Sequence, residues 1–308
     1  MRRQPMGSGV PGGGRRGSGS GPPPERAVPF SHVPRARTRL LCSPAGGRIR
    51  DGSFPIPICY HRRTMPDPAG YLCLVLHGHL PYVLHHGSYP HGEAWLYEAA
   101  AETYLPLLDM IGEVALLEAR PALTVGLTPV LLEQLAHPRF QEGFVAYLDE
   151  RTERAEADAR EFAAGGDLHG AYLARRWAEW HCQAQARFAE LGRDLPGAFS
   201  ARRSEGHIQL LTSNATHAYM PLLLNDAMLT AQMRAGVAAS ERRLGFRPAG
   251  MWLPECAYRP HWEHWLPSVL FDNPRDRPGL ETFLAAAGVT HFFVDTHLIT
   301  QGWPLGTL

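Results

Sequence analysis

The chain has 308 residues, 44% of them hydrophobic, which is enough for one large domain or two small ones. Its formal charge is zero, but residues 1–65 carry twelve arginines and two acidic residues, whereas residues 66–308 carry eighteen arginines and twenty-eight acidic residues. The acidic, more apolar second segment is therefore the expected folded part, and its charge argues against nucleic-acid binding, which needs clustered positive charge. Lysine is absent, which excludes chemistry that requires a lysine amine.

The five cysteines are odd in number and form no CxxC pair, which indicates free thiols in a reducing cytoplasm. Cys256 adjoins Glu255 and invites interpretation as a nucleophile, although a small buried thiol is the commoner role of cysteine. No apolar run reaches the ~18 residues of a membrane span. We therefore expect a cytoplasmic protein with neither a nucleic-acid nor a membrane partner.

Residues 1–65 are dominated by glycine, proline, serine and arginine and show no periodic apolar pattern. Such a segment buries too little surface to offset its chain entropy, so we expect it to be a disordered extension. A basic tail, a transit peptide and a start codon assigned too early are the three interpretations. The last is favoured because Met65 begins "MPDPAGYLCLVLHGHLPYV", in which a strand follows almost at once.

The remainder, residues 66–308, alternates predicted strands with predicted helices. In chain order these are strand 71–76, helix 93–117 with a possible bend at Pro106, strand 122–127, helices 140–164 and 168–191, strand 208–212, helix 226–244, strand 249–253, helix 281–287 and strand 291–294. This alternation predicts an α/β fold built from parallel βα units. The two long helices between the second and third strands exceed a simple crossover and predict a helical insertion beside the sheet.

Polar residues follow each predicted strand. They are His77-Gly78-His79, Thr128-Pro129, Ser213-Asn214-Ala215-Thr216-His217, Pro254-Glu255 and Asp295-Thr296-His297. In a parallel α/β barrel the carboxyl ends of the strands converge on one mouth, where active sites are built. These five strand ends therefore predict the rim of an active site.

The HxH pattern of His77 and His79 places both side chains on one side of an extended strand, because side chains alternate. Three interpretations are open on spacing alone. The pair holds zinc together with a later His or Asp, as in many zinc sites. Alternatively, the histidines are satisfied within the core, or they hydrogen-bond to sugar hydroxyls.

Glu255 stands in "GMWLPECAY", directly after Pro254 and between Trp252 and Tyr258. These neighbours are expected to restrict its rotamers and lower the local dielectric, and a carboxylate so placed is costly unless it is paired or functional. The alternative is a structural glutamate at a helix N-terminus. Trp252 and Tyr258 also offer flat faces on which sugar rings stack.

Three blocks of the sequence together resemble one family. They are "YLCLVLHGHLPYVLHHGSYPHGEAWLYEAAAETYLPLL", "LLTSNATHAYMPLL" and "GMWLPECAYRP". In this order they resemble successive signature blocks of glycoside hydrolase family 57, in particular those of its 1,4-α-glucan branching enzymes. The resemblance runs from about Gly70 to the end of the chain, and three separated blocks make it far more specific than HxH alone.

The resemblance implies an incomplete seven-stranded (β/α) barrel and a retaining transglycosylase acting on α-1,4-glucan as donor and acceptor. It implies that Glu255 is the nucleophile and that an acceptor 6-hydroxyl then displaces it to give an α-1,6 branch. The positions implied to bind the sugar are His77, His79 and His217 at the cleavage subsite, with Trp95 as an aromatic contact. Tyr89 stands where close relatives often carry another aromatic residue, and Trp252 is expected to bind sugar through its flat face. No metal or cofactor is implied.

Retaining chemistry needs a second carboxyl group ~5–5.5 Å from the nucleophile. In the family this is an aspartate in a later "FGHWW"-like block, which has no counterpart in this sequence. Asp295 follows a predicted strand but does not match that block, and Glu205 and Asp272 are weaker candidates still. We therefore expect the acid/base to lie beyond Leu308 and the chain to be a poorly stable, inactive part of the catalytic domain.

Two further functions remain as alternatives. A 4-α-glucanotransferase or an α-amylase of the same family would share the nucleophile but use another acceptor. A metal-dependent polysaccharide deacetylase would instead use His77, His79 and an aspartate around a metal ion.

Overall fold

The computed structural model describes residues 72–116, 123–265 and 275–298 of the chain. The chain divides into two units, Met1–Met65 and Pro66–Leu308, and all the described residues belong to the second. The predicted disordered extension therefore lies outside the described residues, as do Asp272 and residues 299–308. Within the described ranges, no helix has the length and apolar character to cross a membrane.

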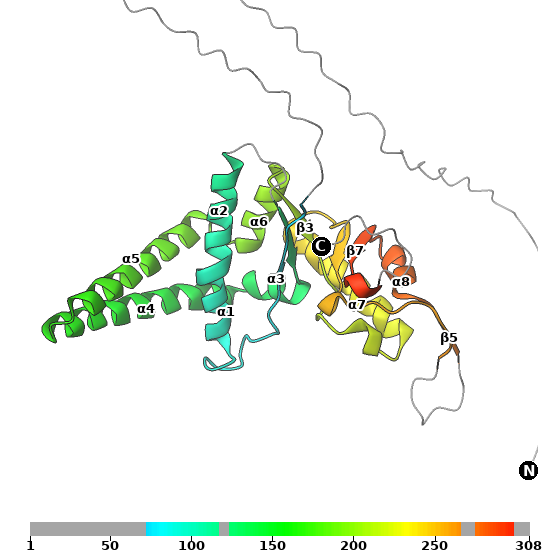
Figure 1. Ribbon diagram of the computed structural model, residues 1–308, viewed down its shortest axis with the longest axis horizontal. Helices are drawn as coiled ribbons and strands as arrows, with labels where there is room; N and C mark the ends of the chain where they lie inside the picture. The colour runs from blue at the N-terminus through cyan, green and yellow to red at the C-terminus, as the bar shows by residue number, and fades with distance from the viewer. Residues whose placement is uncertain (1–71, 117–122, 266–274, 299–308) are drawn as a thin grey trace, which may run out of the picture. The chain divides into compact units, whose positions relative to one another are not determined.

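Parallel strands form the centre of the unit (Figure 1). Strand β1 (Val75–Gly78) pairs with β2 (Leu123–Leu127), and β2 pairs with β3 (Ile208–Leu211), all in parallel. A second parallel pair joins β4 (Gly250–Trp252) to β7 (His291–Phe293). A parallel bridge between Thr212 and Met251 continues the ladder from β3 to β4. Five strands thus lie side by side in the order β1-β2-β3-β4-β7, and the predicted mixed α/β class is confirmed.

Helices account for most of the connections. Between β1 and β2 lie α1 (Glu93–Ala99), a π-helical turn η1 (Ala100–Tyr104) and α2 (Leu105–Ala115). Between β2 and β3 lie α3 (Pro129–Leu135), α4 (Pro138–Ala164), α5 (Leu168–Glu190) and α6 (Leu195–Ser204). The later helices are α7 (Asp226–Leu244) and α8 (Leu280–Ala286). Short 3₁₀ turns lie at Met220–Leu222, Pro254–Cys256 and Thr296–Leu298, and β5 (Trp262–Trp265) pairs antiparallel with β6 (Arg275–Arg277).

Two predicted elements differ from the structure for identifiable reasons. The predicted helix 93–117 is interrupted by η1, because Pro106 has no N–H to donate to the carbonyl of Glu102 and the preceding turn widens. The strand predicted at 71–76 begins only at Val75. Leu72 and Leu74, which the sequence places in a buried strand, are 85% and 54% exposed, because β1 is an end strand of the described ladder. His77 is consequently part of β1 rather than beyond it.

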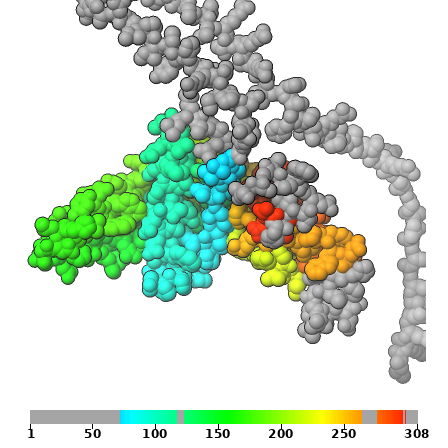
Figure 2. All heavy atoms as spheres, viewed as in Figure 1, coloured from blue at the N-terminus to red at the C-terminus, as the bar shows by residue number. Residues whose placement is uncertain are grey.

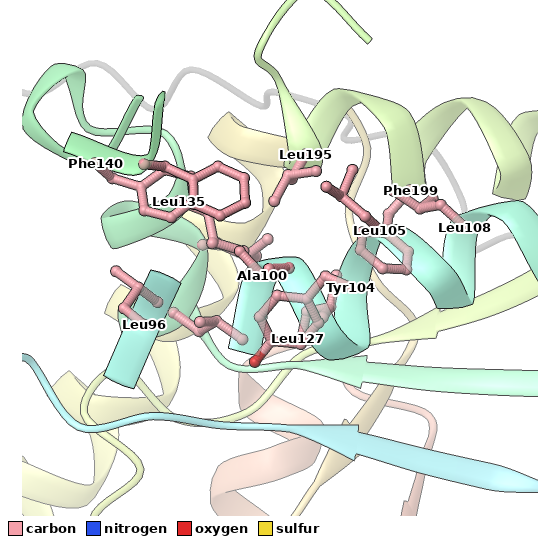
Figure 3. Close-up of a cluster of buried hydrophobic side chains, with 14 of the residues drawn as sticks. Leu96, Ala100, Tyr104, Leu105, Leu108, Leu127, Leu135, Phe140, Leu195 and Phe199 are labelled. Atoms are coloured by element: carbon pink, nitrogen blue, oxygen red, sulfur yellow. The ribbon is translucent and has the colours of Figure 1, made fainter. Parts of the chain in front are cut away.

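The main hydrophobic core lies between the β1–β3 ladder and the helices on one of its faces. Figure 3 shows part of it, where side chains from α1, η1 and α2 meet those of α3, α4 and α6. Phe140 and Phe144 of α4 and Phe188 of α5 form an aromatic group within this core, with Phe144 and Phe188 in edge-to-face contact at 4.9 Å between ring centroids. This group fixes the α4–α5 hairpin (green in Figures 1 and 2) to the sheet layer.

A second, smaller core joins α7 and α8 to β4. Its buried side chains include Met233 and Val237 of α7, Met251 of β4 and Leu284 of α8. Helix α7 begins at an N-cap, Asn225, whose side chain accepts a hydrogen bond from the N–H of Ala227, and ends at Gly245 in the left-handed conformation. These caps fix the length of α7 and so help to position the segment that leads into β4.

We expect Phe144→Ala to lower the free energy of unfolding by about 3–5 kcal/mol, because it leaves a cavity among aromatic rings that cannot collapse into it. Phe162→Ala, on the same helix, is the matched control because that side chain is 42% exposed. Urea denaturation of both variants measures the difference. Equal losses in the two variants would contradict the assignment of Phe144 to the core.

Candidate active site

The candidate site lies at the carboxyl ends of β1 to β4, as the strand-end pattern predicts. His77 is in β1 and His79 follows it, while Trp252 ends β4. His217 lies in the loop after β3, and Glu255 in the 3₁₀ turn after β4. The parallel pairing places these ends at one edge of the ladder, so residues separated by up to 178 positions meet there.

Four aromatic side chains, His77, His79, His217 and Trp252, pack together as a histidine–tryptophan cluster. The His77 ring stacks on Trp252 at 4.8 Å between centroids and on His217 at 4.9 Å. His79 lies 4.0 Å from His217, ring centroid to centroid. The structure thus brings together four of the residues predicted to bind sugar.

Hydroxyl groups at neighbouring strand ends hold the imidazoles. Thr128 Oγ1, fully buried after β2, lies 3.2 Å from His79 Nδ1. Ser213 Oγ lies 3.1 Å from His217 Nδ1 and 2.8 Å from the carbonyl oxygen of Trp252. His77 Nε2 lies 3.3 Å from His217 Nε2. The sequence pattern marked both hydroxyls as polar strand ends but did not predict them as site residues.

Gly126 of β2 makes room for the ring of His77. A β-carbon at this position would lie 3.2 Å from His77 Nδ1, tighter than ordinary van der Waals contact. Any larger residue would therefore displace the imidazole from the cluster or move the strand. Asn214 braces the loop on the other side, because its side chain bonds both to the N–H and to the carbonyl of Ala218.

The backbone is strained where the site residues stand. His217, Glu255 and Cys256 have φ angles of 56°, 55° and 51°, in the left-handed region that non-glycine residues rarely adopt. Each such residue costs of order 1 kcal/mol or more and persists only where the surroundings enforce it, typically at functional sites. In this structure the strained turn after β4 directs the Glu255 side chain outwards, and that side chain is exposed.

Tyr258 is not part of the aromatic surroundings that the sequence predicted for Glu255. Its hydroxyl donates to Glu281 at 2.6 Å and its ring stacks on Phe292, so it packs the segment after the Glu255 turn against α8 and β7. Tyr89 and Trp95 also lie apart from the histidine–tryptophan cluster. Tyr89 is 87% exposed, and Trp95 on α1 lies against His91 at 5.5 Å between ring centroids.

Electrostatics keep the imidazoles neutral. Burial, assisted by the neighbouring His79, lowers the pKa of His77 to about 4. Burial, assisted by His79 and His77, lowers the pKa of His217 to about 3. Burial also lowers the pKa of His79, although the nearby Glu255 charge opposes this. The cluster therefore offers neutral donors and acceptors near pH 7, beside a carboxylate.

Carboxylates surround Cys256 rather than a cation. Burial raises the pKa of its thiol, and the charges of Asp295 and Glu255 add to this effect. A thiol held protonated is a poor nucleophile, which weighs against a catalytic role for Cys256. In the described segments, no group of three His, Cys, Asp or Glu side chains has the geometry of a metal site. The three imidazole rings instead face one another.

Comparisons with known proteins agree on one family. The family described as glycosyl hydrolase family 57 matches residues 73–303. A 1,4-alpha-glucan branching enzyme from Thermococcus kodakarensis is 36% identical over 238 residues, which cover 76% of this chain and 33% of that protein. The chain thus spans about a third of the length of this curated relative.

Solved structures give the same result. The crystal structure of a GH57-type branching enzyme from Pyrococcus horikoshii superposes with a TM-score of 0.69 at 37% identity, covering 76% of this chain and 43% of that one. The alpha-amylase AmyC from Thermotoga maritima superposes with a TM-score of 0.62 at 30% identity, covering 73% of this chain and 39% of that one. The family match over residues 73–303 includes the segments that carry the candidate site.

The lowered pKa values predict that the free energy of unfolding falls as the pH drops from 6.5 towards about 4. In that window the unfolded chain binds protons at His77 and His217 whereas the folded chain does not, so acid favours unfolding. Well above 6.5 these two residues contribute no pH dependence, because they are unprotonated in both states. Urea denaturation at pH 7.5 and pH 5 should show a larger loss for the native sequence than for His77→Gln/His217→Gln. Equal losses would show that the imidazoles are not held neutral.

Proposed function

The chain belongs to glycosyl hydrolase family 57, and we propose that it carries the nucleophile and sugar-binding residues of a 1,4-α-glucan branching enzyme. The observation that carries this proposal is the exposed Glu255 carboxylate on a strained turn beside the histidine–tryptophan cluster. The branching enzymes among its relatives support the reaction type. Because the chain covers a third of one such relative, the activity of a whole enzyme is part of the proposal.

The proposed reaction is a double displacement with retention. A Glu255 oxygen attacks the anomeric carbon of an α-1,4-glucan and forms a glycosyl ester. The glycosidic bond to the departing chain breaks at the same time, and the glycosidic oxygen takes a proton from an acid and leaves as the 4-hydroxyl of that chain. The 6-hydroxyl of an acceptor glucan then displaces Glu255 while a base takes its proton, giving an α-1,6 branch. A strained, exposed turn suits this role, because the carboxylate is presented to substrate without a prior rotation of the backbone.

The histidine–tryptophan cluster is the proposed binding surface for the sugar at the cleavage position. His77, His79 and His217 are neutral, so a ring nitrogen of each hydrogen-bonds to sugar hydroxyls without adding charge. Trp252 stacks behind His77 and offers its remaining surface to the ring. Trp95 and Tyr89, both partly or largely exposed, are proposed as outer contacts for further glucose units.

We further propose that the five parallel strands form an arc of an incomplete (β/α)7 barrel, with α4 and α5 as the main part of a helical insertion after its second strand. The spatial order of the strands follows the order of the chain, as it does around a barrel. The free thiols of Cys73, Cys182 and Cys256 support the proposal of a reducing cytoplasm.

An α-amylase or 4-α-glucanotransferase is the second candidate function, favoured by the similarity to the Thermotoga maritima amylase. These activities share the proposed nucleophile and differ in the acceptor. The deacetylase alternative has less support, because His77 and His217 direct their Nε2 atoms at each other rather than at a common metal position.

We expect 5-fluoro-α-maltosyl fluoride to label Glu255 covalently. Fluoride leaves without protonation, so the test depends on the nucleophile and not on a second carboxyl group. Peptide mass spectrometry should locate a glycosyl ester on Glu255 in the native sequence and in the control Glu263→Gln, an exposed glutamate of β5, but not in Glu255→Gln. Labelling elsewhere with none at Glu255 would refute the assignment.

With unactivated amylose, we expect the 308-residue chain to bind the polymer but form few new linkages. The departing oxygen then needs a proton donor, and the family block that carries this aspartate has no match in the sequence. Linkage analysis by NMR, before and after incubation, measures α-1,6 branches, new α-1,4 linkages and reducing ends. Abundant branches would show that this chain itself supplies the acid, and their loss in Asp295→Asn would identify Asp295 as that acid.

A further inference from the structure

The hydrogen-bond partners of Ser213 determine which nitrogen of His217 carries its proton. The Ser213 hydroxyl has one hydrogen and lies 2.8 Å from the carbonyl oxygen of Trp252, which can only accept. The hydroxyl hydrogen therefore points at that carbonyl. The contact of 3.1 Å between Ser213 Oγ and His217 Nδ1 then requires a hydrogen on Nδ1. Because His217 is neutral, its Nε2 is left as a bare acceptor.

The same reasoning passes from His217 to His77. The two Nε2 atoms lie 3.3 Å apart, so His77 Nε2 must carry the hydrogen that His217 Nε2 accepts. His77 is also neutral, which leaves its Nδ1 without a proton. An independent observation agrees: His77 Nδ1 is buried beside Gly126 and has no hydrogen-bond partner. A bare lone pair is tolerated there better than an orphaned N–H.

We propose that Ser213 is a positioning residue that sets this order of donation, so that His77 and His217 present one donor and one acceptor to a single hydroxyl of the sugar. The proposal rests on the proposed function. A separation of 3.3 Å is long for a direct hydrogen bond, so the contact is readily exchanged for two shorter ones. A substrate hydroxyl entering between the rings accepts from His77 Nε2–H and donates to His217 Nε2.

This arrangement makes the pair selective for a hydroxyl group. A hydroxyl both accepts and donates, whereas fluorine in its place cannot donate and leaves His217 Nε2 unpaired in a site that has displaced water. Without Ser213, His217 is free to move its proton to Nε2. The Nε2–H groups of His77 and His217 would then both point at the sugar hydroxyl, which would have no acceptor for its own hydrogen. The selectivity for a hydroxyl group would disappear.

The first test is the tautomer itself. Nitrogen-15 NMR of histidine-labelled protein near pH 7 should show His217 protonated at Nδ1 and His77 at Nε2 in the native sequence. Ser213→Thr keeps the hydroxyl and should keep this pattern, whereas Ser213→Ala should shift His217 towards the Nε2–H form. Ser204→Ala, an exposed serine of α6, is the control and should change nothing. An unchanged His217 tautomer in folded Ser213→Ala would overturn the proposal.

The second test is recognition. Calorimetric titration should show maltotriose binding about tenfold or more weakly to Ser213→Ala than to the native sequence, with Ser213→Thr restoring most of it. Three maltotriose analogues each carry one fluorine on the non-reducing ring, at C2, C3 or C6. One of the three should bind the native sequence poorly, and Ser213→Ala should lose this discrimination between the analogues. Discrimination that persists in Ser213→Ala would overturn the proposal. If the native sequence binds no maltotriose, the proposed function fails, while the NMR result still decides the role of Ser213.

Discussion

The site depends on the point where β3 runs alongside β4. There the N–H of Thr212 donates to the carbonyl of Gly250 at 3.1 Å, and the N–H of Trp252 donates to the carbonyl of Thr212 at 2.8 Å. These bonds join the β1–β3 ladder to the β4–β7 pair, and Ser213 adds a third bond at the next residue. Because His77 belongs to one side of this junction and Trp252 to the other, their stacking requires both halves of the sheet to be in register.

Each half is supported by its own core, which explains how a few bonds at the junction suffice. The main core fixes β1 to β3 through α2, α3, α4 and α6, while the second core fixes β4 through α7 and α8. Contacts between α3 and α7 and between α6 and α7 link the two groups of helices. The strand ends are therefore positioned mainly by the packing of the two cores, and Ser213 is the residue of the rim that also bonds across the junction.

The sequence allowed the composition of the site to be predicted better than its internal contacts. His77, His79, His217 and Trp252 follow or end strands, and the parallel pairing brings them together. Thr128 and Ser213 were missed as supports, because single hydroxyls after strands occur in many proteins for other reasons. Tyr258 was misjudged, because its distance along the chain from Glu255 does not reveal that the turn directs it towards Glu281. Helix α3 was missed although Thr128-Pro129 is a typical helix start.

The turns after β3 and β4 explain why sequence spacing alone could not predict how the side chains of His217 and Glu255 are oriented. A residue with positive φ reverses the local direction of the chain, so the alternation that governs strands does not apply to His217 or Glu255. Buried neighbours offset the backbone strain at both residues. Asn214 hydrogen-bonds across the loop of His217, and Leu253 and Pro254 are buried next to Glu255 in its turn. Neither turn contains glycine at the strained position, although glycine would relieve the strain. The two residues that hold these strained positions are an imidazole of the histidine–tryptophan cluster and a carboxylate whose charge raises the pKa of His79.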